Sequence, residues 1–267
     1  MNRGASQVPA RLLFLGTGTS HGVPMIGCTC SVCRSTDPRD KRTRVGAAVE
    51  TDDGAVILID TPTELRLQLI ATGITRVDAV LFTHLHADHI HGIDDLRAIT
   101  ARRHVHLPMY GSRETLAGLQ HKFDYIFDDR IRPLPGTSKP QGRTIPLEPD
   151  VPVRIADVDV TAVPVPHGPV MIYAYRIGSL AYVTDAKSIA ESALEQLRGA
   201  RVLVINALFH TPHPSHLSFP EAIAAARAIG AERTYLTHLT HDNFHAALEA
   251  ELPPGIAPAY DGLSISV

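Results

Sequence analysis

Hydrophobic and polar positions along the chain follow two patterns, which predict strands and helices. Short apolar runs rich in β-branched residues are typical of strands. They occur at 11–15, 45–51, 56–60, 79–83, 104–110, 158–164, 171–177, 180–184, 201–206, 233–237 and 263–267. Apolar positions with helical spacing occur at 63–71, 189–197, 220–229 and 243–252. The patterns therefore predict a mixed α/β chain.

The order of these elements favours a mixed sheet or a pair of sheets. Predicted strands cluster as hairpins at 45–60 and 151–184 and elsewhere alternate with helices, which fits poorly with a purely parallel sheet. The Pro- and Gly-rich segment 132–152 is expected to be a surface excursion rather than a linker, because residues suited to chemistry fall on both sides of it. We therefore expect one domain over residues 1–267.

Composition is that of an ordinary globular protein, with 44% hydrophobic and 20% charged residues in 267. No apolar run reaches the ~18 residues that a membrane span needs, and residues 1–11 lack the apolar stretch of a signal peptide. A cytoplasmic protein without a membrane partner is the prediction. The net charge of −3 argues against a large nucleic-acid footprint, but it is compatible with a small phosphate held by bound metal.

The stretch from His84 to His89 carries the strongest chemical signal. It places His84, His86, Asp88 and His89 directly after an apolar strand. On an extended strand exit the first two side chains point to the same side, and the last two face back toward them from the first turn of a following helix. Such a set can serve two adjacent cations, whereas the alternative is a group of surface histidines.

Four more predicted strands end in a possible ligand, namely Asp60, His167, Asp185 and His238. The order, spacing and context of these motifs resemble the metallo-β-lactamase superfamily of binuclear hydrolases across nearly the whole chain. The resemblance implies an α/β (α+β) fold, a four-layered αββα sandwich with two mixed β-sheets, and two divalent metal ions at one edge between the sheets. It also implies hydrolysis by a hydroxide that bridges the two metals.

Carried over position by position, the resemblance assigns each candidate residue a role. One metal would be held by His84, His86 and His167, the second by Asp88, His89 and His238, with Asp185 bridging both. Asp60 would orient a ligand histidine rather than bind metal. The same ligands accept zinc, manganese or iron. Two divalent cations, two carboxylates and a hydroxide leave a charge of about +1, which suits a monoanionic phosphodiester.

The three cysteines Cys28, Cys30 and Cys33 lie within six residues, and an odd, clustered set indicates metal ligation rather than a disulfide framework. Thiolates at this spacing suit a structural zinc site with a fourth ligand from elsewhere, whereas buried inert thiols are the alternative. Together with His241, three residues after His238, they resemble the phosphoribosyl cyclic phosphate phosphodiesterases (PhnP-type) within the superfamily. That resemblance implies His241 as the fourth ligand, with His21 and His245 as competing candidates.

A leaving alkoxide needs a proton, and histidine is the side chain whose pKa suits that role near neutrality. His210, His213 and His216 lie in one segment, and the resemblance implicates His216, which completes a catalytic set with Asp88 and Asp185. We therefore expect a binuclear phosphodiesterase that acts on a small cyclic phosphodiester. The alternatives are a tRNA 3′-processing endonuclease, a thioester or other ester hydrolase, and a non-catalytic metal-binding module. The resemblance also implies a homodimer.

Overall fold

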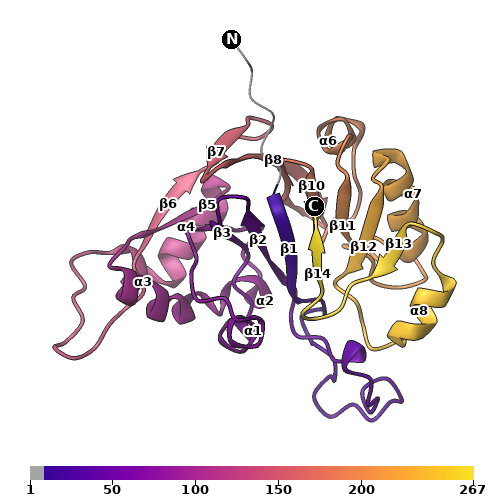
Figure 1. Cartoon of the computed structure of the whole chain (residues 1–267), viewed down its shortest axis with the longest axis horizontal. Helices are drawn as coiled ribbons and strands as arrows, with labels where there is room; N and C mark the ends of the chain where they lie inside the picture. Colours follow the sequence, from indigo (N-terminus) through magenta and orange to yellow (C-terminus); the bar gives the residue numbers. More distant parts are fainter. Residues whose placement is uncertain (1–8) are drawn as a thin grey trace.

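The computed structural model describes residues 9–267, so the first eight residues of the predicted domain lie outside the described part. Within it, the strands form two seven-stranded sheets, and helices lie on opposite sides of them (Figure 1). A shared core separates the sheets, and two further cores lie under the helices. The predicted four-layered αββα sandwich with two mixed sheets is confirmed.

The first sheet has the strand order β14-β1-β2-β3-β4-β5-β6. Its strands are β1 (Pro9–Gly16), β2 (Gly46–Thr51), β3 (Val56–Ile59), β4 (Ala79–Leu81), β5 (Leu107–Gly111), β6 (Gly142–Pro146) and β14 (Ser264–Ser266). Neighbours are antiparallel from β14 to β3 and parallel from β3 to β6.

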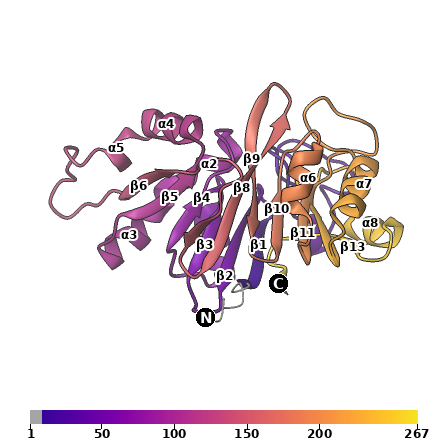
Figure 2. The ribbon, with the colours of Figure 1, turned by 90° about the horizontal axis from the view of Figure 1, so that it is seen from above.

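The second sheet repeats this arrangement in the order β13-β12-β11-β10-β9-β8-β7. Its strands are β7 (Val153–Ile155), β8 (Val158–His167), β9 (Val170–Ile177), β10 (Leu180–Val183), β11 (Val202–Asn206), β12 (Arg233–Thr237) and β13 (Ile256–Pro258). Neighbours are antiparallel from β7 to β10 and parallel from β10 to β13. The β8–β9 hairpin extends past the ends of the neighbouring strands (Figure 2).

Helices from the first half of the chain cover the first sheet, and helices from the second half cover the second sheet. The first group is α1 (Leu65–Thr72), α2 (Ala87–Ile90), the short 3-10 helix η2 (Ile93–Leu96), α3 (Arg97–Arg103), α4 (Arg113–Lys122) and α5 (Asp124–Phe127). The second group is α6 (Glu191–Leu197), α7 (Phe219–Ile229) and α8 (His245–Glu251). A further 3-10 helix, η1 (Pro38–Asp40), lies in the loop between β1 and β2.

The core between the sheets contains buried tyrosines whose hydroxyls are satisfied. Tyr175 is fully buried, and its hydroxyl donates to the Phe82 carbonyl at 2.6 Å. Tyr173 donates from its backbone to the Thr83 carbonyl at 3.1 Å. Because Phe82 and Thr83 directly follow β4, these two bonds fix the end of a strand in the first sheet against β9 in the second. They lie immediately before the motif that begins at His84.

Three strands and three helices of the structure were missed by the sequence patterns. Segment 132–152 is only partly the predicted surface excursion, because it contains β6, which pairs with β5 along its whole length. The strands β7 and β13 are three residues long, too short for a periodic signal, and the helices α3, α4 and α5 fall outside the predicted helices.

Among the described residues, none of the helices has the length and the apolar character that crossing a membrane requires.

Candidate binuclear metal site

The first half of the site lies at the exit of β4. His84 follows the strand by three residues, and His86 is the N-cap of α2. Asp88 and His89 lie in the four residues of that helix, and both are buried. The chain therefore changes from extended to helical within this motif, as predicted. It brings four ligand-type side chains from six consecutive residues to one edge of the sandwich.

The second half comes from the ends of strands in the other sheet. His167 ends β8, Asp185 follows β10 by two residues, and His238 directly follows β12. The structure groups these with the first half in two clusters whose ligand atoms lie within 4.8 Å of one another. The clusters are His84, His86, His167, Asp185 and Asp88, His89, His238.

Asp185 lies between the two clusters. One carboxylate oxygen is 3.8 Å from His84 Nε2 and 3.4 Å from His89 Nε2, and the other is 3.5 Å from His238 Nε2. A carboxylate in contact with both clusters has the position of a bridging ligand. Each predicted binuclear ligand is thus brought to the site, although its binding of metal stays a prediction.

Three of the strand-end residues share an unusual backbone conformation. Asp60, Asp185 and His238 have φ angles of 64°, 58° and 59°. This left-handed region is unfavourable for residues with a side chain, and such conformations persist where surrounding structure over-determines them, often at functional sites. At each position the chain leaves a buried strand and turns sharply.

The tautomers of three histidines follow from their outer hydrogen bonds. His89 Nδ1 donates to Asp60 at 2.7 Å, and His167 Nδ1 donates to the Ser215 carbonyl at 2.9 Å. His84 Nδ1 is 2.9 Å from the Thr83 hydroxyl. That hydroxyl donates to Asp60 at 2.8 Å, so it accepts from His84. In the neutral form, all three rings therefore direct an unprotonated Nε2 into the cluster, as metal-ligating histidines do.

Buried nitrogen atoms without hydrogen-bond partners test whether the site fits metal ions. Among the proposed ligands, Nε2 of His84, His89 and His238 is buried and has no hydrogen-bond partner. Leaving such groups unsatisfied is costly, and several in one place indicate an ion that completes them. Imidazole and carboxylate groups are donors that zinc, manganese and iron accept. The donor set therefore fits a pair of divalent cations.

Burial and neighbouring charges shift the pKa values of several side chains in the site. Burial holds the pKa of His84 well below its usual value and lowers the pKa of His238 to about 4, so both rings are neutral at physiological pH. Burial opposes the ionisation of Asp185, yet the neighbouring His238 and His89 hold its pKa well below the usual range. Burial disfavours the charged form of His89, but Asp185 and Asp60 raise its pKa well above the usual value. Burial raises the pKa of Asp60.

His216 lies beside the clusters in the segment that precedes α7. Its Nε2 is 3.5 Å from Asp185, and its ring stacks on His238 with a centroid separation of 4.8 Å. The Ser215 hydroxyl is 2.9 Å from its Nδ1 and 3.3 Å from Nδ1 of His213. Ser215 thus contacts three histidines around the site, including His167 through its carbonyl. No sequence pattern distinguished this serine.

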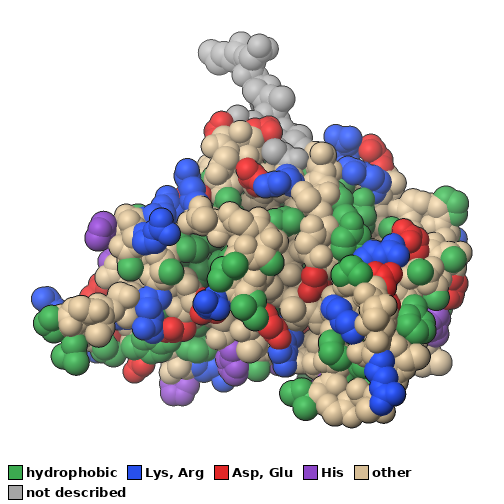
Figure 3. All heavy atoms as spheres, turned by 60° about the horizontal axis from the view of Figure 1, so that its bottom comes forward, with side chains coloured by type: hydrophobic (Ala, Val, Ile, Leu, Met, Phe, Trp, Pro, Cys, Tyr) green, Lys and Arg blue, Asp and Glu red, His purple; other side chains and the backbone are tan. Residues whose placement is uncertain are grey.

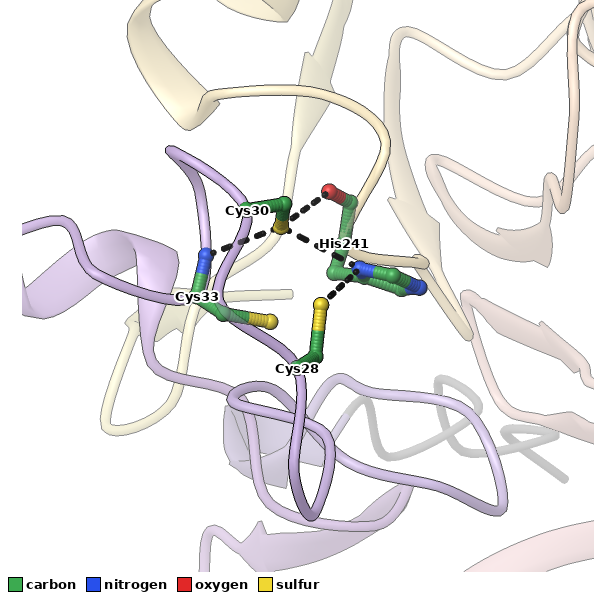
Figure 4. A group of neighbouring side chains, drawn as sticks. All are labelled: Cys28, Cys30, Cys33 and His241. Carbon is green, nitrogen blue, oxygen red and sulfur yellow. Dashed lines mark hydrogen bonds between the residues drawn. The ribbon is translucent and has the colours of Figure 1, made fainter.

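The cysteines form a separate cluster with His241, about the loop between β1 and β2 (Figure 4). His241 Nδ1 is 3.3 Å from Cys30 and 3.5 Å from Cys28, and Cys33 completes the group. The hydrogen bond with His241 lowers the pKa of Cys30 to about 6, whereas burial raises the pKa of Cys33 to about 11. Three thiols and one imidazole are the donors of a tetrahedral zinc site.

The competing candidates for the fourth ligand lie elsewhere. His245 is buried, and its Nδ1 is 3.4 Å from the guanidinium of the buried Arg42. His21 is exposed and belongs to none of the metal-type clusters found among residues 9–267. Of the three histidines considered from the sequence, the structure brings only His241 to the cysteines.

Comparison with known proteins agrees with this geometry. The Beta-lactamase superfamily domain matches residues 56–239, which is more than half of the chain. The chain therefore belongs to this superfamily of metallo-hydrolases. A crystal structure described as a new diphosphatase from the PhnP family is 39% identical and has a TM-score of 0.89. The alignment covers 97% of this chain and 98% of that one, so the chain belongs more narrowly to the PhnP family.

Two other relatives extend the comparison. An octanoyltransferase of Porphyromonas gingivalis is 42% identical over 258 residues, which cover 95% of this chain and 51% of that protein. The chain thus spans about half the length of this relative. The structure of Zn²⁺-bound PqqB from Methylobacterium extorquens is 20% identical with a TM-score of 0.74, covering 96% of this chain and all of that one. At this identity it shares the fold.

Proposed function

We propose that this chain is a metal-dependent hydrolase of a small phosphodiester, of the phosphoribosyl cyclic phosphate type. The observation that carries the proposal is the position of Asp185. It contacts both clusters of proposed ligands, and one of its oxygens is 3.5 Å from His216 Nε2. Bound divalent cations would activate water and neutralise charge on phosphoryl oxygens. Asp88 and Asp185 are the carboxylates among the proposed ligands, so the protein offsets this positive charge only in part and favours an anionic substrate.

His216 is the residue that we propose protonates the leaving oxygen. The Ser215 hydroxyl fixes its ring through Nδ1, which leaves the unpartnered Nε2 facing Asp185 and the clusters. In the proposed reaction, water adds to phosphorus, one phosphorus–oxygen bond breaks, and Nε2–H gives its proton to the departing oxygen. With a cyclic diester the ring opens, so a single product carries both the phosphomonoester and the new hydroxyl group. General acid catalysis of this kind contributes about 10²- to 10⁴-fold.

A diphosphate diester is the second candidate substrate. The relative that is 39% identical over nearly the full length of both chains is described as a diphosphatase. The attack is again on phosphorus, but the leaving group is a phosphate, which departs with less need of a proton than an alkoxide. The two candidates therefore differ in how far they depend on His216.

A tRNA 3′-processing endonuclease and other ester hydrolases have less support. On the face shown in Figure 3, Lys and Arg side chains are interspersed with Asp and Glu rather than gathered in one basic patch. Binding of a long phosphate backbone needs such a patch. We therefore propose a small-molecule substrate rather than a nucleic acid. The proposed cofactors are two divalent ions at the histidine clusters and one structural zinc at the cysteines.

The test is turnover of three substrates by the metal-loaded protein: bis(p-nitrophenyl) phosphate, a 2′,3′-cyclic nucleotide and a diphosphate diester. Asp185→Ala should abolish all three activities. His216→Ala should reduce cyclic nucleotide hydrolysis about 10²- to 10⁴-fold and affect the p-nitrophenyl ester less, because p-nitrophenolate leaves without a proton. His210→Ala is the matched control, since His210 is an exposed histidine of the same segment that bonds Asn243. Absence of turnover of all three by wild type would refute the proposal.

A further inference from the structure

The turn that carries Asp185 is held by backbone and side-chain bonds from three other segments. Lys187 N donates to the Pro166 carbonyl at 2.7 Å, next to His167. Leu217 N, next to His216, donates to the Ala186 carbonyl at 2.8 Å. The turn is thus the point where three segments that carry site residues are joined.

The third attachment is the side chain of Asn206, a fully buried residue that ends β11. Its Oδ1 accepts from Ala186 N at 2.8 Å, and its Nδ2 donates to the Ala186 carbonyl at 3.1 Å. One carboxamide therefore satisfies both backbone groups of a single residue. Among side chains, only Asn and Gln offer an acceptor and a donor in this arrangement.

The position of Asn206 explains why a side chain is needed there. The ladder between β10 and β11 ends with the pair Val183 and Ile205. Beyond it, Asp185 adopts a φ of 58° and the chain leaves the extended conformation, so backbone pairing cannot continue. The Asn206 carboxamide replaces the missing ladder bonds immediately after the strained residue. Such bonds are what keep an unfavourable backbone conformation in place.

We propose that Asn206 is a positioning residue for the metal centre, which holds Asp185 through the backbone of the adjoining Ala186 and His216 through the shared Ala186 carbonyl. The inference rests on the proposed function of this site. The Asn206 carboxamide forms its hydrogen bonds with the backbone of Ala186 and acts through it. Its removal should therefore disturb the bridging carboxylate and the proposed proton donor together.

The test compares two substitutions of buried carboxamides in the full-length protein. Asn206→Asp keeps the shape and the acceptor but directs a second oxygen at the Ala186 carbonyl. Gln68→Glu is the matched control, because Gln68 is 4% exposed and its Nε2 likewise donates to a backbone carbonyl, that of Arg44, at 3.0 Å. Gln68 lies on α1, and its Nε2 bonds the Thr43 hydroxyl as well as the Arg44 carbonyl, neither of which belongs to a proposed ligand. Both variants therefore lose a buried amide donor, and only one loses it at the metal centre.

The readout is cobalt(II) binding, measured by competition with a chelating dye, and the visible spectrum of the cobalt-loaded proteins. For Asn206→Asp we expect roughly 10- to 100-fold weaker binding at the histidine clusters and an altered spectrum at saturation. The ultraviolet absorption of thiolate-bound cobalt reports the cysteine cluster and should stay unchanged. Gln68→Glu should match wild type in both measurements.

Asn206→Ser provides a second variant with a side chain that reaches only one of the two backbone groups, and it should weaken binding to an intermediate degree. Wild-type cobalt affinity and spectrum in either folded Asn206 variant would overturn the inference, as would equal changes in Gln68→Glu. A wild type inactive on phosphodiesters, with cobalt binding weakened by Asn206→Asp, would refute the proposed reaction and support the positioning role. If wild type hydrolyses phosphodiesters and Asn206→Asp binds cobalt as wild type does, the positioning role alone is refuted.

Discussion

Replacement of Asp60 by asparagine tests how the site orients its histidines. The Asp60 carboxylate is fully buried and accepts three hydrogen bonds, from Thr83 N at 2.8 Å, the Thr83 hydroxyl at 2.8 Å and His89 Nδ1 at 2.7 Å. In Asp60→Asn, the remaining oxygen can keep Thr83 N. The Thr83 hydroxyl can rotate to accept from the new amide. His89 Nδ1–H then faces an amide donor, so its bond has no replacement.

Two independent magnitudes describe the loss of that bond. A hydrogen bond to a charged group contributes about 1.5–3 kcal/mol. Loss of the outer partner of a metal-ligating histidine weakens metal binding roughly 10- to 100-fold, which corresponds to roughly 1.4–2.7 kcal/mol. The two ranges overlap because the bond that keeps Nδ1 protonated is the same bond that leaves Nε2 free for metal. We therefore expect Asp60→Asn to act mainly by weakening metal binding, roughly 10- to 100-fold.

The assay is zinc or manganese affinity by chelator competition, alongside urea denaturation of the metal-free protein. Asp261→Asn is the matched control, because Asp261 also accepts from a threonine backbone nitrogen and hydroxyl, those of Thr43, at 2.7 and 2.6 Å. Its third donor is the Thr17 hydroxyl rather than a ligand histidine. The control should lower the free energy of unfolding and leave metal affinity unchanged. Wild-type metal affinity in Asp60→Asn would refute the reasoning.

Three further outcomes are expected. Cys30→Ser should lose the metal of the cysteine cluster and keep those of the histidine clusters in elemental analysis, and a wild-type metal content would contradict this. Tyr175→Phe should lower the free energy of unfolding by about 1–3 kcal/mol in urea, because the buried Phe82 carbonyl loses its donor, and an unchanged midpoint would count against it. The hydrogen bond from Lys187 lowers the pKa of Glu221 from 4.5 to about 2. A lowered carboxyl pKa stabilises the fold above the unfolded value, and that stabilisation is lost as pH falls from about 4.5 to about 2. Glu221→Gln should therefore flatten the pH dependence of Tm in that window, and identical curves for the two proteins would exclude the effect.

Local sequence was sufficient to predict the part of the site that is contiguous. His84, His86, Asp88 and His89 are consecutive enough that strand and helix geometry alone brings them together, and the structure places α2 where that required a helix. The strand ends were recognisable because each apolar run stops at a polar residue. The pairing of clusters across two sheets was available only from the family resemblance, since no local pattern encodes it.

The same strand-end signal does not distinguish the roles of the residues that carry it. Asp60 and Asn206 both end a buried apolar run, as Asp185 and His238 do. Asp60 accepts a hydrogen bond from His89, whereas Asn206 accepts one from the backbone of Ala186. The difference depends on which loop packs against each strand end, and that is set by contacts between distant segments. The strand β6 was missed for the same reason, because its pairing with β5 stabilises a sequence with little intrinsic strand character.

Of the four metal-type groups among the described residues, three combine residues from both sheets. His84 and His86 follow β4 of the first sheet, whereas His167 ends β8 and Asp185 follows β10 of the second. The cysteine cluster likewise joins the loop after β1 to His241, which lies just beyond β12. A ligand that binds the folded state alone stabilises it in proportion to the logarithm of its concentration over its Kd. Metals held at these places would therefore tie the two halves of the sandwich together, so that metal content and packing between the sheets are linked properties of this fold.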